Sequence, residues 1–392
     1  MSNSNYNHKN KRILQIIPNM EIGGAERTVL EVTSFLKKTD YTSIVLTSGG
    51  KLIEDLEKLN IEVIKYPIDK KNPFSIIKNI FKLRKIFLEN KIDLVHVRSR
   101  GPAWSAIFAA RNLSLPILTT WHGHAVKSSW LKKKYNSIMH RGDAVIANSS
   151  YTAKSINTIY NIGEDKIDII PRGVDIDKFK PQNFSNVDII NIRKKWNIND
   201  PKKIILLLPA RLTRWKGHEV VIHAINLLKK EKFYKDIICL FAGEQKGGDR
   251  YIKDLQKMIT KYSIDEKIKL IGRVKNMPLA YQASKIILSP SIEPEPFGRI
   301  PIEAQASGKI VIASDSGAVK DTIKSGSKYT GFKVKPNDSK KLADQIKIIF
   351  KMEKEEIEEI QTRAILNVKN NFSLDTMCIK TLEVYNRLLF SK

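Results

Sequence analysis

Two glutamates, Glu295 and Glu303, stand eight residues apart in the segment SIEPEPFGRIPIEAQASG, with Phe297 and Gly298 between them. The segment predicts an extended loop followed by a helix, and the free backbone N–H groups at such a helix start attract phosphate. Carboxylates repel phosphate, so we expect both glutamates to face neutral, hydroxyl-rich groups on either side of it. Each carboxylate can accept two hydroxyl hydrogen bonds. A nucleotide sugar contains a sugar, a diphosphate and a ribose, which fit this arrangement.

Two cations follow a predicted strand in the segment LLLPARLTRWKGHE. Arg211 comes just past that strand, and Lys216 stands at the start of the next predicted helix. Two cations and a helix start directed at one point form an anion site suited to a diphosphate. The alternative is a solvated basic loop, because the whole chain is rich in lysine.

The first half of the chain has its own candidates after strands. Gly23 and Gly24 form a turn without side chains, which lets a ligand approach the backbone closely, although an ordinary tight turn has the same composition. Neither the G-x-G-x-x-G fingerprint nor the P-loop motif occurs. In TTWHGHAVK, we interpret His122 as a hydrogen-bonding group in a cleft rather than a structural histidine. A metal site with His124 lacks further ligands at suitable spacing.

The candidate site residues must be positioned by strands that end directly before them. Apolar, β-branched runs alternate with amphipathic helical patterns, which predicts an α/β fold of right-handed βαβ units in parallel, doubly wound sheets. The predicted strands of the first series are 12–18, 42–48, 62–67, 93–98, 116–121 and 144–149. Those of the second series are 203–210, 236–243, 268–272, 285–290, 309–314 and 329–334. Ligands bind at the carboxyl ends of such strands, where the unusual residues stand.

The chain of 392 residues is long enough for two cores. We predict an N-terminal Rossmann-like domain at 1–180, a C-terminal Rossmann-like domain at 181–372 and a C-terminal helix at 373–392. The polar segment 176–200 reads as a linker with a short helix.

Composition indicates a soluble globular protein, with 42% hydrophobic and 28% charged residues and no apolar run long enough to cross a bilayer. The N-terminus lacks the length and cleavage site of a signal peptide. Cys239 and Cys378 lie in apolar patterns without a second cysteine nearby, so we expect core thiols in a reducing compartment. A cytoplasmic protein is therefore expected.

The net charge of +27 favours anionic partners: membrane lipid, phosphorylated substrate or nucleic acid. No nucleic-acid-binding motif is present, and the charge is spread over both halves, so nucleic acid is not expected as a partner. The basic helical pattern at 74–91 could lie on an anionic membrane. A helix packed on its sheet with a lysine-rich outer face explains the same pattern and is preferred. Drift towards AT-rich codons would also raise the lysine content.

Taken together, the motifs GGAE, PRGVDIDKF, ARLTRWKG and FAGE, the Glu295–Glu303 segment and GKIVIASDSGAVKD resemble the retaining GT-B glycosyltransferases of family 4. The resemblance extends from about residue 12 to 340. The form PEPFGRIPIEAQASG is further similar to bacterial members that assemble lipopolysaccharide or other surface glycans. The resemblance implies a GT-B fold, with two facing Rossmann-like domains and a cleft between them. It also implies that the domain at 1–180 binds the acceptor, that the domain at 181–372 binds the donor, and that the C-terminal helix at 373–392 packs back on the first domain.

The resemblance implies that Arg211 and Lys216 bind the donor diphosphate and that Glu303 binds the ribose hydroxyls. The segment GRVKNMP, with Val274, matches the region that usually contacts the nucleobase. The donor is expected to be a UDP- or GDP-linked sugar. No cofactor and no catalytic metal are expected, because Arg and Lys stabilise the leaving group electrostatically in this family.

The same resemblance implies that Glu295 binds hydroxyls of the transferred sugar, assisted by the backbone at Phe297 and Gly298. His122 would meet the sugar from the N-terminal domain, and the loop at 23–24 would close near the diphosphate. The catalytic residues are thus predicted to be His122, Glu295, Arg211 and Lys216.

The reaction implied is transfer of a sugar, with retention, to a hydroxyl of a glycan or lipid-linked acceptor in surface-polysaccharide synthesis. Peripheral attachment to the inner face of the cytoplasmic membrane would suit such an acceptor. The chain departs from many relatives at Ser316–Gly317 and Asp321, which affects fine donor contacts. A sugar-nucleotide epimerase of the same fold, or a non-catalytic sugar-nucleotide binder, remains an alternative.

Overall fold

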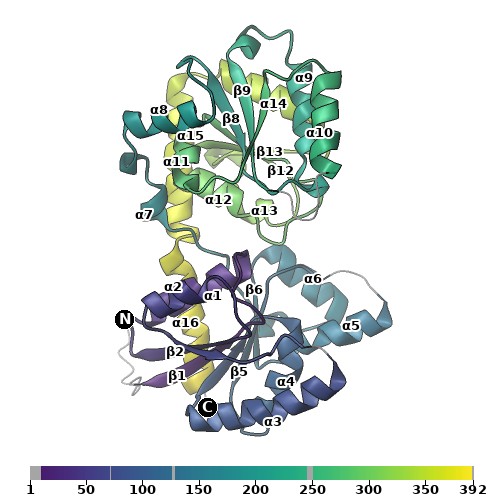
Figure 1. The fold of residues 1–392 in the computed structure, drawn as a ribbon, viewed down its shortest axis with the longest axis vertical. Helices are drawn as coiled ribbons and strands as arrows, with labels where there is room; N and C mark the ends of the chain where they lie inside the picture. The colour runs from purple at the N-terminus through teal and green to yellow at the C-terminus, as the bar shows by residue number, and fades with distance from the viewer. Residues whose placement is uncertain (1–9, 71, 126–128, 245–249, 391–392) are drawn as a thin grey trace. The chain divides into compact units, whose positions relative to one another are not determined.

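The computed structural model describes residues 10–70, 72–125, 129–244 and 250–390 (Figure 1). The chain divides into two compact units. Unit 1 comprises Met1–Gly173 and Leu374–Lys392, and unit 2 comprises Val174–Ser373. The predicted first boundary at 180 was therefore too late, because 174–180 packs with the second unit rather than the first.

Unit 1 contains a seven-stranded parallel sheet in the order β3-β2-β1-β4-β5-β6-β7. Its strands are β1 Lys11–Ile16, β2 Tyr41–Thr47, β3 Glu62–Lys65, β4 Leu94–Val97, β5 Ile117–Trp121, β6 Ala144–Ala147 and β7 Ile167–Ile169. The six predicted strands are all present. The seventh, β7, was not predicted, because three residues are too few for a periodic pattern to emerge.

Helices cover both faces of this sheet. One apolar core lies under α3 Pro73–Glu89, α4 Arg100–Arg111, the short helix Ser137–His140 and α6 Ser150–Tyr160. The opposite cores lie under α1 Gly24–Leu36, α2 Ile53–Lys58 and the C-terminal helix α16 Leu374–Phe390. Tyr385 and Met377 of α16 are buried among side chains of β1 and α1, so the end of the chain completes unit 1.

The helix α3 packs on the sheet through Leu83, Ile86 and Phe87, as the preferred interpretation of segment 74–91 required. Its outer face differs from the expectation. Besides lysines, it exposes large apolar side chains, including Phe74 and Phe81. No helix within the described ranges is long and apolar enough to cross a membrane.

Unit 2 contains a six-stranded parallel sheet in the order β10-β9-β8-β11-β12-β13. Its strands are β8 Ile204–Leu208, β9 Ile237–Ala242, β10 Ile268–Gly272, β11 Ile286–Ser289, β12 Ile310–Ser314 and β13 Phe332–Val334. All six were predicted. The expected linker at 176–200 instead forms two helices, α7 Ile176–Phe179 and α8 Asn186–Lys195, the second with a capping box between Ser185 and Asp188.

Helices also cover this second sheet (Figure 1). They are α9 His218–Leu227, α10 Arg250–Lys261, α11 Met277–Gln282, α12 Arg299–Ala306, α13 Val319–Thr322, α14 Ser339–Lys351 and α15 Lys354–Asn371. In each sheet the strand order reverses once, between β1 and β4 in unit 1 and between β8 and β11 in unit 2. Ligands of open α/β sheets bind outside the strand ends at such a reversal.

Candidate functional site

In unit 2, the loop after β8 and the loop after β11 meet at the strand-order reversal. The backbone N–H of Ile292 donates to the carbonyl of Trp215 at 2.8 Å. Gly217 has φ +77° and lies against Pro290, whose carbonyl oxygen would be 2.0 Å from any Cβ at this position. Only glycine therefore allows the two loops to approach this closely.

The centre of this junction is an ion pair. Lys216 Nζ lies 2.8 Å from Glu295 Oε2, and only 11% and 8% of the two side chains are exposed. The other carboxylate oxygen of Glu295 accepts a hydrogen bond from the Ser291 hydroxyl. The Lys216 ammonium also lies 4.1 Å from the centre of the Trp215 ring. A nearly buried charge pair needs such additional partners to offset its desolvation.

A third loop, after β12, holds the backbone of Glu295. Gly317 has φ +58°, and a Cβ there would lie 2.4 Å from the Glu295 carbonyl oxygen. The next residue, Ala318, donates its N–H to that same oxygen at 3.0 Å. Gly317, which from sequence was only a departure from a family pattern, is thus a structural support of Glu295.

The helix α12 begins beside this pair, with Gly298 as N-cap and no side-chain cap. Within the described ranges, the backbone N–H groups of Phe297 and Gly298 meet no hydrogen-bond acceptor. On α12, the Glu303 carboxylate accepts a hydrogen bond from the Tyr281 hydroxyl at 3.0 Å and lies 3.5 Å from Arg299 Nε. Burial, together with the charge of Glu303, raises the pKa of Tyr281 well above 10. The phenol therefore stays protonated and fixes the glutamate.

Two predicted residues lie on neighbouring loops and not in this junction. Arg211 is exposed, and its guanidinium has no hydrogen bond or ion pair with any residue the structure describes. Val274, between β10 and α11, is half-buried and lines a separate pocket of about 530 Å³. The structure therefore brings together Lys216, Glu295 and the start of α12. No described contact joins Arg211 or Val274 to them.

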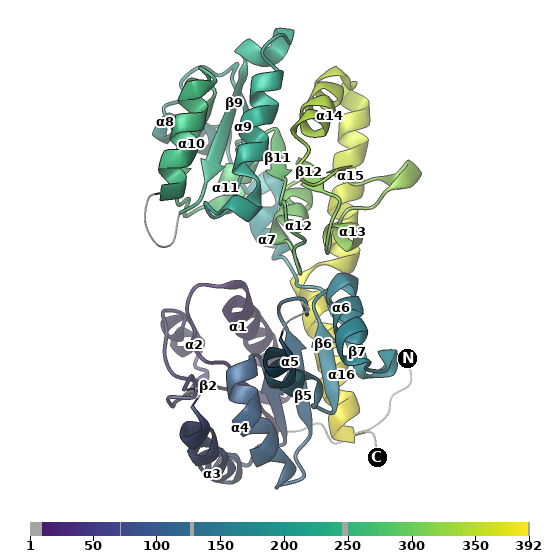
Figure 2. The same ribbon diagram turned by 90° about the vertical axis from the view of Figure 1, so that its right-hand side faces the viewer.

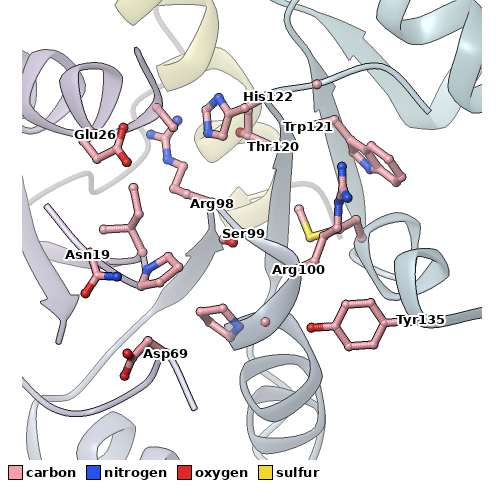
Figure 3. A pocket seen from close by; sticks show the side chains of 17 residues that line it. Asn19, Glu26, Asp69, Arg98, Ser99, Arg100, Thr120, Trp121, His122 and Tyr135 are labelled. Carbon is pink, nitrogen blue, oxygen red and sulfur yellow. The ribbon is translucent and has the colours of Figure 1, made fainter. Parts of the chain in front are cut away.

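Unit 1 has a pocket of about 610 Å³ at the carboxyl ends of β1, β4 and β5 (Figure 3). Its lining contains hydrogen-bonding and charged side chains of both signs. Those labelled in the figure include Asn19, Glu26, Asp69, Arg98, Arg100, His122 and Tyr135. Such a lining suits a polar ligand with several hydroxyl groups.

His122 lies at the rim of this pocket as a neutral imidazole. Arg172 Nη2 lies 3.4 Å from His122 Nδ1. Burial and then the charges of Arg172 and Arg98 hold the pKa of His122 well below its usual 6.5. Because a guanidinium only donates, Nδ1 must accept and the proton must lie on Nε2. That Nε2 is buried and meets no acceptor within the described ranges.

Arg172 also explains the Gly pair. A Cβ on Gly24 would lie 2.1 Å from Arg172 Nη1, so the guanidinium occupies the space that a side chain would need. Gly23, the N-cap of α1, has an extended backbone. Arg172 therefore joins the glycine turn to His122. The sequence contained the signal, since Arg172 lies in the motif PRGVDIDKF, but the strand before it was not predicted.

A second arginine, this one buried, supports the floor of the pocket. Arg98 follows β4, is 4% exposed and donates to the Gln15 side chain. Beneath it, His96 is held at 2.7 Å by the Tyr385 hydroxyl and at 2.7 Å by the Thr120 hydroxyl. Sequence reasoning missed Arg98, although its place directly after a strand was the available signal. In the described part of the chain, no group of three or more His, Cys, Asp or Glu side chains could hold a metal ion.

Family models match both parts of the chain. A model described as "Glycosyltransferase Family 4" matches residues 22–178, and one described as "Glycosyl transferases group 1" matches residues 188–367. The curated relatives with the first matches are covered by this chain over 66% to 70% of their own length. One relative, the lipopolysaccharide core biosynthesis mannosyltransferase LpsB of Rhizobium meliloti, is 24% identical over 253 residues, which are 64% of this chain and 68% of LpsB.

Solved structures share the whole fold. The crystal structure of a glycosyltransferase from Rickettsia africae is 36% identical, with a TM-score of 0.90, and the match covers 99% of this chain and 100% of that chain. The Anabaena protein Alr3699/HepE, solved in complex with UDP, is 20% identical with a TM-score of 0.83, covering 96% and 99% of the two chains. Both the expected GT-B fold and the expected family are confirmed. The chain belongs to the glycosyl transferases group 1, with an N-terminal part of Glycosyltransferase Family 4, and is therefore a glycosyltransferase.

Proposed function

We propose that this enzyme transfers a sugar, with retention of configuration, from a UDP- or GDP-linked donor bound at the loops of unit 2. The observation that carries the proposal is the Lys216–Glu295 pair beside the free N–H groups at the start of α12. An ammonium and helix N–H groups bind phosphate, and an adjacent carboxylate accepts hydroxyl hydrogen bonds. The complex of the Anabaena protein with UDP supports a nucleoside diphosphate as ligand of this fold.

In the proposed reaction, an acceptor hydroxyl attacks the anomeric carbon while the bond to the diphosphate breaks. Lys216, Arg211 and the N–H groups of Phe297 and Gly298 stabilise the charge that develops on the leaving diphosphate. Glu295 and Glu303 hold hydroxyls of the sugar and of the ribose. We propose that these cations suffice without a metal ion, so that a chelator leaves the rate unchanged.

His122 is proposed to donate a hydrogen bond from Nε2 to a sugar hydroxyl. Its neutral state supports this role, because an imidazole held neutral by burial and by Arg172 presents one fixed donor at all pH values near neutrality. The 610 Å³ pocket of unit 1 is proposed to receive the acceptor. The acceptor is proposed to be a glycan or a lipid-linked sugar of a bacterial surface polysaccharide, which the relative LpsB supports.

The proposal is tested by calorimetric titration of the full chain with UDP, GDP and ADP. We expect one of UDP and GDP to bind, with Lys216→Met weakening that binding at least tenfold and Lys253→Met, on the exposed face of α10, leaving it unchanged. The donor sugar carrying that nucleotide is then tested for hydrolysis and transfer, with the anomeric configuration read by NMR. Absence of binding by all three nucleotides, or an inverted product, would contradict the proposal.

A further inference from the structure

The outer face of α3 is apolar along a narrow line. Four large side chains of this helix are exposed, namely Phe74 at 86%, Ile77 at 56%, Phe81 at 65% and Leu88 at 62%. At about 100° per residue, these four positions fall within a sector of roughly 60° on the helix surface. They form a stripe rather than scattered exposed residues, and such a stripe indicates an interaction site.

Cations border this stripe on both sides. On the same helical projection, Lys78, Lys82 and Lys85 follow one flank and Arg84 the other. The helix has one acidic residue, Glu89, which pairs with Lys85 at 3.5 Å. An apolar stripe with cations on both flanks is the pattern of a helix that lies flat in the interface of an anionic bilayer.

The neighbouring helices α4 and α5 (Trp130–Asn136) extend this character, and both views place α3, α4 and α5 in succession on one side of the sheet (Figures 1 and 2). Phe108 of α4 is 38% exposed, and Trp130 and Leu131 of α5 are 68% and 69% exposed. Together the three helices contain nine Lys and Arg residues and one Glu. The whole chain has 68 Lys and Arg residues against 41 Asp and Glu residues. The excess of cations on these three helices is therefore larger than the general lysine enrichment of the chain explains.

We propose that this α3–α5 surface docks unit 1 on a membrane that contains anionic lipid. The apolar stripe would enter the interface, and the bordering cations would meet lipid phosphates. A second copy of the chain is disfavoured as the occupant, because two such basic faces repel each other. The inference rests on the proposed function only for its purpose, which is to bring the acceptor pocket to a lipid-linked acceptor.

The test is flotation of the full chain with vesicles of phosphatidylcholine alone and of phosphatidylcholine mixed with phosphatidylglycerol. Two variants alter the surface, Phe74→Ser/Phe81→Ser in the stripe and Lys78→Gln/Lys82→Gln/Lys85→Gln at its border. Two control variants make the same kinds of substitution at other exposed sites, in unit 2. They are Ile348→Ser/Leu366→Ser, at positions 51% and 50% exposed, and Lys253→Gln/Lys257→Gln/Lys261→Gln on α10.

We expect the wild-type chain to float with the mixed vesicles and much less with phosphatidylcholine alone. The stripe variant should lower the partition coefficient at least about tenfold, and each lysine removed should lower it about fivefold. Both controls should match the wild type. Equal flotation of all variants, or no flotation with the mixed vesicles, would overturn the proposal. So would a wild-type dimer in sedimentation that the stripe variant dissociates without any change in flotation.

Calorimetric titration of the same variants with the nucleotide that binds the wild type separates this proposal from the proposed function. Nucleotide binding should be unaffected in every variant, which also shows that each is folded. Should the wild type bind no nucleotide yet float with anionic vesicles, the proposed function fails and the docking surface stands. Should the wild type bind a nucleotide but not float with anionic vesicles, the docking surface fails and the proposed function stands.

Discussion

Lys216 Nζ lies 2.8 Å from Glu295 Oε2, so a cation and a carboxylate from two loops of unit 2 form one ion pair that is almost excluded from water. From sequence these residues had separate expected roles, with the lysine on the diphosphate and the glutamate on the sugar. In the proposed function the ion pair would couple those roles. A phosphate that approached Lys216 would compete with Glu295 for the ammonium, and the Glu295 carboxylate would become available to hydroxyl groups.

The ion pair should also stabilise unit 2. Replacing Lys216 by Met leaves the Glu295 carboxylate nearly buried without its partner, which should lower the free energy of unfolding by about 3 kcal/mol, the lower end for buried pairs. The double variant Lys216→Met/Glu295→Met should lose less than the sum of the single losses, by about 1–3 kcal/mol. Urea unfolding of the four proteins in the absence of nucleotide measures this difference. Additive losses would show that the two side chains do not interact.

Removal of Arg211 and removal of Lys216 should have different effects on stability but similar effects on the reaction rate. Arg211 is exposed, and no described residue pairs with its guanidinium, so Arg211→Ala should leave the unfolding free energy within about 0.5 kcal/mol of the wild type. Arg211→Ala and Lys216→Ala should each lose about 3–4 kcal/mol of transition-state stabilisation, seen as a lower kcat. Initial rates with the donor identified by titration provide the measurement. Near-normal turnover of both variants would exclude these cations as the leaving-group site.

Gly24 and Gly23 offer a matched pair for testing the position of Arg172. A Cβ on Gly24 would lie 2.1 Å from the end of the Arg172 side chain, and one on Gly23 would lie 2.2 Å from the end of the Glu26 side chain, so each substitution should shift a different side chain. Gly24→Ala should displace Arg172 from His122, raise the pKa of His122 and reduce kcat. Gly23→Ala should be nearly neutral. NMR titration of His122 follows the change, and an unaltered pKa in Gly24→Ala would refute this account.

Gly317 and Gly326 both have positive φ, at +58° and +77°, but only the first contacts Glu295. Gly326→Ala should cost about 1 kcal/mol of stability, the backbone penalty alone, because no atom lies within 4 Å of the added Cβ. Gly317→Ala should cost more, since its Cβ would be 2.4 Å from the Glu295 carbonyl oxygen, and it should also weaken nucleotide binding. Equal stability and equal affinity of the two variants would contradict the supporting role of Gly317.

Three histidines with lowered pKa values should make the fold sensitive to acid. Burial is the main cause that lowers the pKa of His96 and His122 well below 6.5 and that of His218 to about 4. Below pH ~6.5 the unfolded chain takes up protons that the native chain does not, so stability falls as the pH decreases. Each histidine contributes a slope of at most ~1.4 kcal/mol per pH unit. His218→Phe, whose ring would keep the edge contact with Phe241, should reduce this slope, measured by urea unfolding across pH.

The sequence by itself determined the two parallel sheets, because alternating apolar runs and helical patterns are local signals that each strand and helix carries within a few residues. It also determined the helix at 299–306. Pro301 falls in its first turn, where proline is tolerated, and Gly308, with φ +61°, follows its end, where glycine is favoured. The placement of the candidate residues after strands followed from the parallel topology.

Contacts between distant residues were decided only by the tertiary structure. Lys216 meets Glu295, and Arg172 meets both Gly24 and His122, because strands far apart in sequence are neighbours in the sheets. No local pattern encodes which loop approaches which, or whether a glycine leaves room for a guanidinium. The exposed stripe of α3 was equally undetermined, since its periodicity fits a buried face and a docking face alike. Only the packing of Leu83, Ile86 and Phe87 on the sheet shows which face remains outside.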